Sequence, residues 1–398
     1  MKLTYKHTKY AAYTGYITQA IVNNLPALLF AMFNTKFGIP LEKIGLLVSI
    51  NFGVQILVDF LSVKFIDRIG YRVGMVGAHI FAVAGLLSLG ILPRVMGDTY
   101  AALLIAVVLS AIGGGLTEVL ISPIVESLPG DEKAGAMSLL HSFYCWGHVG
   151  VVLLSTLYFA AAGMENWFYL PIVWAVVPFF NIFFFSQVPL RVLVEEENRV
   201  PVSRLFSSRL FWILMALMVC AGASEQAMSQ WTSLFAEQGL GVTKAMGDLL
   251  GPCMFAALMG LSRLLYGLFG AKLNIRKGLL FSSALCIGAY LLAVFAPHPV
   301  LSLAGCGLCG FSVGLMWPGT FSLAAGEYAA GGTAMFALLA LAGDVGCGAG
   351  PGLVGWISGW LEKSMSQISA LKTGIGVAIC FPLLMLLGIL LLRKSSRH

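Results

Sequence analysis

Twelve long apolar stretches constrain the fold of this chain more than any other feature of its sequence. A helix needs about 20 consecutive apolar residues to cross the hydrocarbon core of a bilayer. In lipid only helices and closed barrels satisfy the backbone, and the sequence lacks the alternating segments typical of a barrel. The predicted spans are residues 10–34, 42–66, 73–93, 99–126, 134–162, 166–188, 209–237, 244–269, 277–296, 300–326, 332–360 and 370–392. We therefore predict an all-α membrane protein with twelve transmembrane helices.

The charged residues support this interpretation and indicate an orientation. They make up only 11% of the chain, whereas soluble domains carry roughly 25%. Most Lys and Arg residues outside the spans fall in every second connecting segment, and segments rich in these residues face the cytoplasm. We therefore predict a multi-pass protein of the plasma (inner) membrane with both termini in the cytoplasm.

The longest connection between spans divides the chain into two predicted halves of six helices each. It carries the acidic run Glu195 to Glu197 and several arginines, which we interpret as a solvated linker. The halves repeat weakly, because GHVG at residues 147–150 matches GDVG at residues 343–346. We predict an N-terminal half at residues 1–188, a cytoplasmic linker at residues 189–208 and a C-terminal half at residues 209–398, arranged as parallel repeats.

Charged residues within the spans, namely Asp59, Glu118, Glu225, Arg263 and Asp344, are candidate functional groups. A charge at the bilayer centre costs a few kcal/mol and is kept where it faces a wet cavity or a partner. Glu118 and Glu225 lie near mid-span, where a carboxyl group held between helices can exchange a proton. Coupling requires that its two protonation forms favour different conformers. Asp344 is a third candidate for proton coupling and Arg263 a candidate for gating, with pairing inside the bundle or snorkelling as alternatives.

Polar and aromatic side chains inside five spans form the predicted ligand site. In the fifth span His141, Tyr144 and His148 share one helical face, and histidine exchanges protons near neutral pH. Amides and indoles suit a polyhydroxyl ligand, because each hydroxyl group donates and accepts and aromatic faces pack on C–H surfaces. The predicted substrate-binding residues are Asn23, Asn24, Glu118, His141, Tyr144, His148, Glu225, Gln226, Gln230, Trp231 and Trp317. Helix packing or interhelical hydrogen bonding is the alternative for the amides, the tryptophans and the histidines.

The segment KFIDRIGYR at residues 64–72 resembles the loop signature of the major facilitator superfamily, although Val63 replaces its usual opening glycine. The resemblance implies two six-helix halves that expose a central site alternately to either side of the membrane. It also implies a gating role for Asp67, Arg68 and Arg72. Positive charge that only sets the topology is the alternative.

A narrower resemblance is to the fucose permease group of sugar/proton symporters. It rests on Glu118 five residues before Pro123, on LHSFYCWG at residues 140–147 and on the pair Asn23 and Asn24. The chain departs from that group at Ala27 and Tyr144, which disfavours fucose itself. The resemblance implies proton-coupled uptake of a small polar solute.

Several other classes of function are disfavoured. The sequence shows neither a nucleophile–base–orienter set nor metal-ligand spacing, which disfavours an enzyme or a metal site. The eight cysteines lie in apolar segments, and Cys306 and Cys309 are interpreted as packing residues. The basic residues lie in short loops without stacking aromatics, which disfavours nucleic acid as a partner.

These observations predict a secondary active transporter, not an enzyme, that takes up a sugar or sugar derivative by alternating access. We expect a monomer in the lipid bilayer that needs no cofactor and is driven by the proton gradient. Sodium, which binds similar oxygen ligands, stays open as the coupling ion. A proton-driven exporter of amphipathic compounds and a non-transporting membrane sensor stay open as alternative functions.

Overall fold

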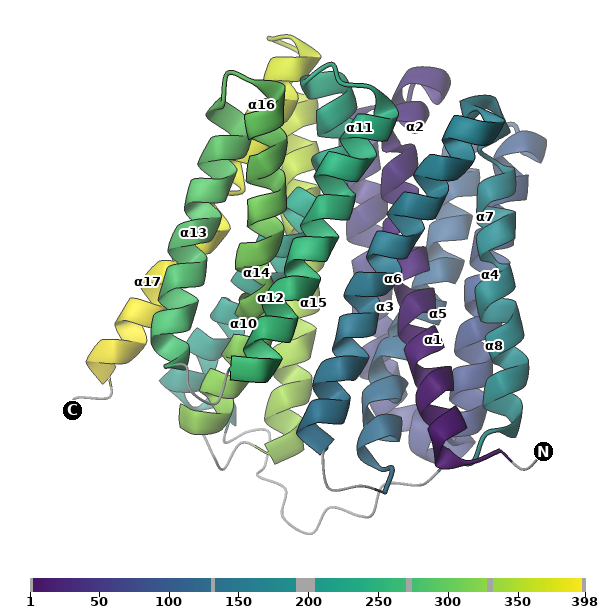
Figure 1. Ribbon diagram of the computed structural model, residues 1–398, viewed down its shortest axis with the longest axis vertical. Helices are drawn as coiled ribbons and strands as arrows, with labels where there is room; N and C mark the ends of the chain where they lie inside the picture. The colour runs from purple at the N-terminus through teal and green to yellow at the C-terminus, as the bar shows by residue number, and fades with distance from the viewer. Residues whose placement is uncertain (1–2, 130–132, 191–204, 270–273, 328–331, 396–398) are drawn as a thin grey trace. The chain divides into compact units, whose positions relative to one another are not determined.

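The computed structural model describes residues 3–129, 133–190, 205–269, 274–327 and 332–395. Within these helices, the side chains of residues 63–68, 126, 133–138, 267, 325–327, 332–334, 336–337 and 393–395 lie outside the description. All regular elements in the described ranges are helical (Figure 1). Among the described residues, twelve helical stretches are long and apolar enough to cross a membrane, the first from Tyr5 to Phe37 and the last from Gln367 to Leu392. The prediction of an all-α protein with twelve transmembrane helices is confirmed.

The chain folds into two compact units. The first comprises Met1–Ile39 and Ile50–Val194, and the second comprises Pro40–Ser49 and Glu195–His398. The second unit therefore includes the first turns of α3 (Leu41–Ile69), while the rest of α3 belongs to the first unit. Most of the predicted linker lies outside the described residues.

The first unit consists of long α-helices and several shorter helical segments. They are α1 (Tyr5–Asn24), η1 (Pro26–Leu29), α2 (Phe30–Phe37), the later turns of α3, α4 (Tyr71–Val95), α5 (Thr99–Glu126), α6 (Lys133–Ala162), η2 (Met164–Asn166), α7 (Tyr169–Trp174) and α8 (Val176–Gln187). The first membrane span bends from α1 into the 3₁₀ turn η1 at Pro26, which has no backbone N–H to continue the helix.

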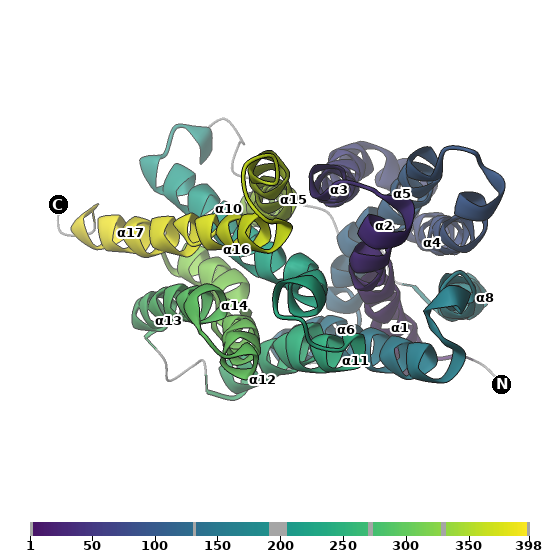
Figure 2. The same ribbon diagram turned by 90° about the horizontal axis from the view of Figure 1, so that it is seen from above.

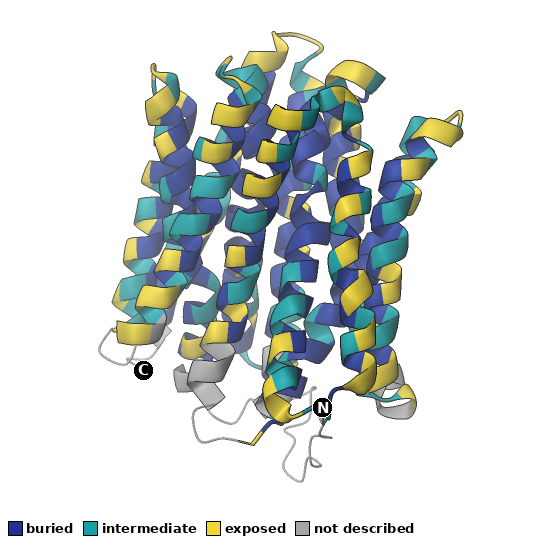
Figure 3. Cartoon of the chain, turned by 45° about the vertical axis from the view of Figure 1, so that its right-hand side comes forward, coloured by how far each residue is buried: buried dark blue, intermediate teal, exposed yellow. Residues whose placement is uncertain are grey.

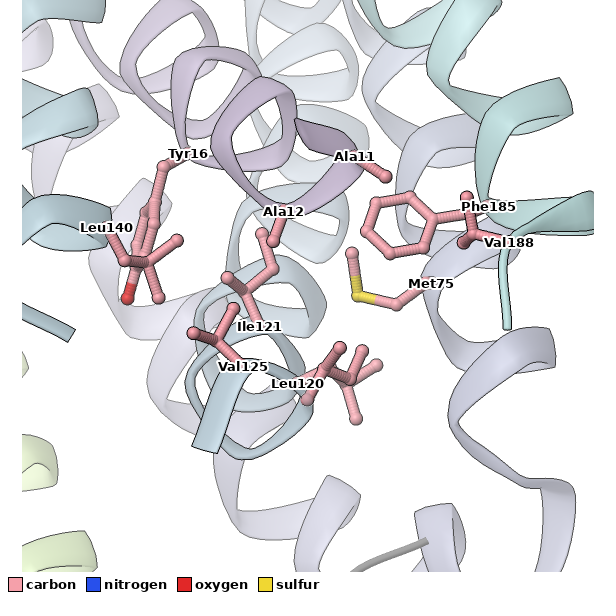
Figure 4. Packing of buried hydrophobic residues seen from close by; sticks show 11 residues of the cluster. Ala11, Ala12, Tyr16, Met75, Leu120, Ile121, Val125, Leu140, Phe185 and Val188 are labelled. Carbon is pink, nitrogen blue, oxygen red and sulfur yellow. The ribbon is translucent and has the colours of Figure 1, made fainter. Parts of the chain in front are cut away.

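The core of the first unit lies between α1, α4, α5, α6 and α8. Figure 4 shows part of it, with Ile121 of α5 beneath Ala12 of α1, and with Met75 of α4 facing Phe185 of α8. Helices α4 and α5 approach closely because Gly113 has no side chain: a Cβ there would lie 2.6 Å from the Ala78 carbonyl oxygen. This packing places α5 directly against α1.

The second unit is built around α10 (Arg209–Leu234), which packs against α14 (Pro299–Glu327) and α15 (Gly332–Leu361) (Figure 2). Every residue of α10 from Cys220 to Leu234 is buried. Gly350 of α15 allows the close approach, since a Cβ there would lie 2.6 Å from the Ala223 carbonyl oxygen. The remaining elements are η3 (Phe235–Gly239), α11 (Lys244–Asp248), η4 (Leu249–Cys253), α12 (Met254–Phe269), α13 (Ile275–Phe295), α16 (Gln367–Val377) and α17 (Cys380–Ser395).

Other helices present one buried and one exposed face (Figure 3). The exposed faces carry large apolar side chains, such as Phe179, Phe180 and Phe183 of α8. A soluble protein rarely exposes so much contiguous apolar surface, whereas lipid solvates it. The buried faces hold the polar residues from which a site can be built.

Candidate functional site

Glu118 is held in the first unit by an amide from α1. The Nε2 atom of Gln19 donates a hydrogen bond of 2.7 Å to Oε2 of Glu118. Gln19 is buried and Glu118 is half-buried. The contact forms because α1 and α5 pack against each other, which brings two residues 99 positions apart into one place.

A second group of amides lies one helical turn along α1. The Oδ1 atom of Asn23 accepts from Nε2 of Gln55 at 3.0 Å and from Nδ2 of Asn51 at 3.3 Å. All three side chains are buried. Gly114 of α5 lies beside them, because a Cβ there would be 3.5 Å from Cδ of Gln55 and 3.6 Å from Oδ1 of Asn23. Gln19 and Asn23 are four residues apart, as are Gly114 and Glu118, so both groups form one row between α1, α3 and α5.

The predicted histidine stripe on α6 divides between two environments. His148 is buried, whereas His141 is exposed and its ring centroid lies 5.3 Å from that of Tyr16. Between them, the hydroxyl of Tyr144 accepts from Nδ2 of Asn24 at 3.2 Å. The structure thus joins Asn24 and Tyr144 by a hydrogen bond, whereas the two histidines differ, with His148 buried and His141 exposed.

Gln19, Asn51 and Gln55 were not among the site residues predicted from the sequence. A signal was present, because Gln19 precedes Asn23 by four residues and Gln55 follows Asn51 by four, the spacing of one helical face. The stacked pair Tyr13 and Phe143 was not predicted either; its ring centroids lie 4.2 Å apart with an interplanar angle of 4°.

Glu225 in the second unit has a charged partner. The Nη2 atom of Arg263 lies 3.2 Å from Oε2 of Glu225, and the two side chains are 15% and 9% exposed. The other oxygen of Glu225 accepts from Gln226 at 3.3 Å, and Gln226 accepts from Gln230 at 3.0 Å. Glu225, Gln226 and Gln230 of α10 therefore form one chain of hydrogen bonds that ends at an ion pair.

The remaining predicted site residues of the second unit are packed against α15 or belong to it. Trp231 is fully buried, and its Nε1 donates to the Pro351 carbonyl oxygen at 3.1 Å. The indole of Trp317 lies against Gly343, where any side chain would collide with it. Asp344, the next residue, is buried.

Of the predicted gating residues in the segment at residues 64–72, the structure describes the side chain of Arg72. Arg72 donates to the carbonyl oxygens of Phe185 at 2.8 Å, Ser186 at 2.6 Å and Val188 at 2.8 Å, so its guanidinium caps the C-terminal end of α8. A cation at this end also interacts favourably with the helix dipole. The side chains of Asp67 and Arg68 lie outside the described residues.

Glu118 and Glu225 differ in the charge of the side chains that contact them. A guanidinium is always positive and only donates, so a proton taken up by Glu225 would leave the Arg263 charge without this counter-ion. The amide of Gln19 is neutral, and a protonated carboxyl group keeps acceptor capacity for its N–H. No group of three or more His, Cys, Asp or Glu side chains suited to a metal ion occurs in the described ranges.

The sequence matches a family model described as the Major Facilitator Superfamily over residues 12–351. No curated protein sequence matches the chain. A bacterial homologue of the human lysosomal transporter Spinster, solved in an inward-facing and occupied conformation, has a TM-score of 0.76 at 14% identity and covers 99% of this chain and 98% of its own. The E. coli fucose:proton symporter FucP has a TM-score of 0.65 at 14% identity, covering 95% and 97%. At such identities, these two structures show a shared fold.

Proposed function

Because this chain belongs to the Major Facilitator Superfamily, a family of membrane transporters, we propose that it takes up a small polar solute together with protons, with Glu118 as the coupling group. The observation that carries the proposal is the 2.7 Å hydrogen bond from the neutral amide of Gln19 to the Glu118 carboxyl group. Because Gln19 is neutral, Glu118 can gain or lose a proton without leaving this partner as an unpaired charge. Coupling requires such a change of protonation.

The surrounding groups suit a small polar solute. Amides from α1 and α3, the hydroxyl of Tyr144 and the exposed ring of His141 all belong to the first unit. Together they supply donors and acceptors, which a sugar or sugar derivative needs at each hydroxyl group. We expect the protein to act as a monomer in a plasma membrane, with both termini in the cytoplasm and with the proton gradient, rather than a cofactor, as the driving force.

The decisive experiment uses the purified full chain in liposomes that contain a trapped pH dye. A panel of neutral sugars, polyols and sugar acids is added outside, and internal acidification identifies a solute that enters with protons. An uncoupler should abolish accumulation of that solute while leaving its exchange across the membrane.

The variant Glu118→Gln should abolish accumulation against a gradient and retain exchange of internal for external solute, because the amide cannot carry a proton between the two sides. Accumulation by Glu118→Gln at the wild-type level would remove Glu118 from the coupling role. Accumulation driven by a sodium gradient without acidification would replace the proton by sodium.

A further inference from the structure

The two glutamines of the first unit use their donor groups inside the protein. Gln19 donates through Nε2 to Glu118, and Gln55 donates through Nε2 to Asn23. Their amide oxygens, Oε1 of Gln19 and Oε1 of Gln55, have no hydrogen-bond partner among the described residues. Gln19 is 4% exposed and Gln55 is 0% exposed, so both are more than nine-tenths buried.

The direction of each amide follows from its neighbours. An ionised carboxylate only accepts, so the nitrogen of Gln19 must face Glu118 and its oxygen must point elsewhere. While Glu118 is ionised, the oxygen of Gln19 therefore stays available to a donor from elsewhere. Asn51 and Gln55 both donate to the same oxygen of Asn23, which orients the amide of Gln55 in the same sense.

A buried acceptor that lacks a donor is costly, and neither amide oxygen has a donor among the described residues. A ligand that brings donor groups would satisfy both oxygens. Hydroxyl and ammonium groups supply such donors, whereas carboxylates and phosphates supply acceptors that would face the amide oxygens and Glu118 unfavourably.

We infer that Gln19 and Gln55 form an acceptor subsite between α1, α3 and α5 that selects solutes with hydrogen-bond donors at two positions and rejects acceptor-only anions. The inference rests on the proposed function, since it names the chemistry of the solute that the same site takes. Gly114 lines the subsite on the α5 side, because a Cβ there would lie 3.5 Å from Cδ of Gln55.

The first part of the test varies the ligand on the wild-type chain. Equilibrium binding to the purified full chain is measured in detergent, without any gradient, with two series matched in carbon-chain length. The shorter series is erythritol, 1,4-diaminobutane and succinate. The longer series is sorbitol, 1,6-diaminohexane and adipate. We expect a donor-bearing compound to bind at least about tenfold more tightly than the dicarboxylate of the same length. Preference for the polyol identifies hydroxyl groups as the source of the donors, and preference for the diamine identifies ammonium groups.

The second part varies the protein. Gln19→Met and Gln55→Met keep the side-chain length and remove the acceptor, so each should weaken binding of the preferred compound about tenfold. Asn181→Leu is the matched control, because Asn181 is a buried amide of the same unit whose Oδ1 also lacks a hydrogen-bond partner in the described part of the chain. The amide of Asn181 donates to the Ala11 carbonyl oxygen beside His79, two turns of α1 from Gln19. Its replacement by leucine should therefore leave binding unchanged.

Tighter binding of succinate or adipate, no binding of any donor compound, or unchanged binding by folded Gln19→Met and Gln55→Met would each overturn the subsite. The comparison of ligands on the wild-type chain decides the matter even where a variant fails to fold. Because binding is measured without a gradient, loss of the subsite is distinguishable from loss of proton coupling, which is read from accumulation alone.

Discussion

Each unit holds a glutamate within a membrane span, half-buried in the first and buried in the second, but the contacting partners differ in charge. Glu118 of the first unit accepts from the neutral amide of Gln19, while Glu225 of the second unit pairs with the guanidinium of Arg263. Both lie on long apolar helices, and hydropathy alone treats them alike. These two contacts respond differently to protonation, because an amide contact tolerates a change of protonation that an ion pair resists.

This comparison suggests a division of labour. The Glu225–Arg263 pair, extended through Gln226 and Gln230, suits a fixed link between α10 and α12. The row around Gln19, Asn23 and Gln55 suits a group that changes its charge and meets a solute. Each of the following experiments sets a residue of one unit against its counterpart in the other.

The largest expected difference lies in accumulation of the solute. We expect the double variant Glu225→Gln, Arg263→Met to retain accumulation driven by the proton gradient, whereas Glu118→Gln loses it. The double variant removes both charges together, so that no buried charge is stranded. Liposome uptake with and without an uncoupler measures both. Loss of accumulation in the double variant, if it is folded, would place coupling in the second unit as well.

The next largest effect is on stability. Arg263→Met alone should destabilise the protein by about 3–5 kcal/mol, because it leaves the carboxylate of Glu225 buried without its cation. Adding Glu225→Gln should recover most of that loss. Denaturant unfolding in detergent gives both values. Equal stability of the single and double variants would show that Glu225 and Arg263 do not stabilise each other.

A smaller contrast is expected between the two amides that contact the carboxyl groups. Gln19→Met should cost about 1.5–3 kcal/mol, the range for a hydrogen bond to a charged group. Gln226→Met should cost about 0.5–1.5 kcal/mol, because Arg263 still neutralises Glu225. The same unfolding measurement ranks them. A larger loss for Gln226→Met would show that Glu225 depends more on its amide partner than Glu118 does.

The smallest effect concerns the hydrogen bond from Asn24 to Tyr144. Tyr144→Phe should cost about 0.6 kcal/mol, the average for an interhelical hydrogen bond in a membrane. Its effect on uptake should exceed its effect on stability if the hydroxyl also contacts the solute. Kinetics and unfolding of the same preparation separate the two roles, and wild-type kinetics would leave Tyr144 as a packing residue.

The membrane fold follows from the sequence because span length and hydropathy belong to each segment on its own. The twelve spans were predicted within several residues of their observed positions, although the first begins at Tyr5 rather than residue 10 and contains the break at Pro26. The candidate carboxyl groups were likewise visible, since a charge within an apolar helix stands out without knowledge of its neighbours.

The partners of those charges were decided by the tertiary structure. Gln19 meets Glu118 and Gln55 meets Asn23 across tens of residues of chain, and nothing in local periodicity indicates which helical faces come together. For the same reason the sequence did not indicate that Arg72 contacts carbonyl oxygens at the end of α8, and its gating role stays a prediction. Hydropathy acts along one helix, whereas hydrogen bonds and ion pairs depend on the few ångströms between two helices, and only packing sets that distance.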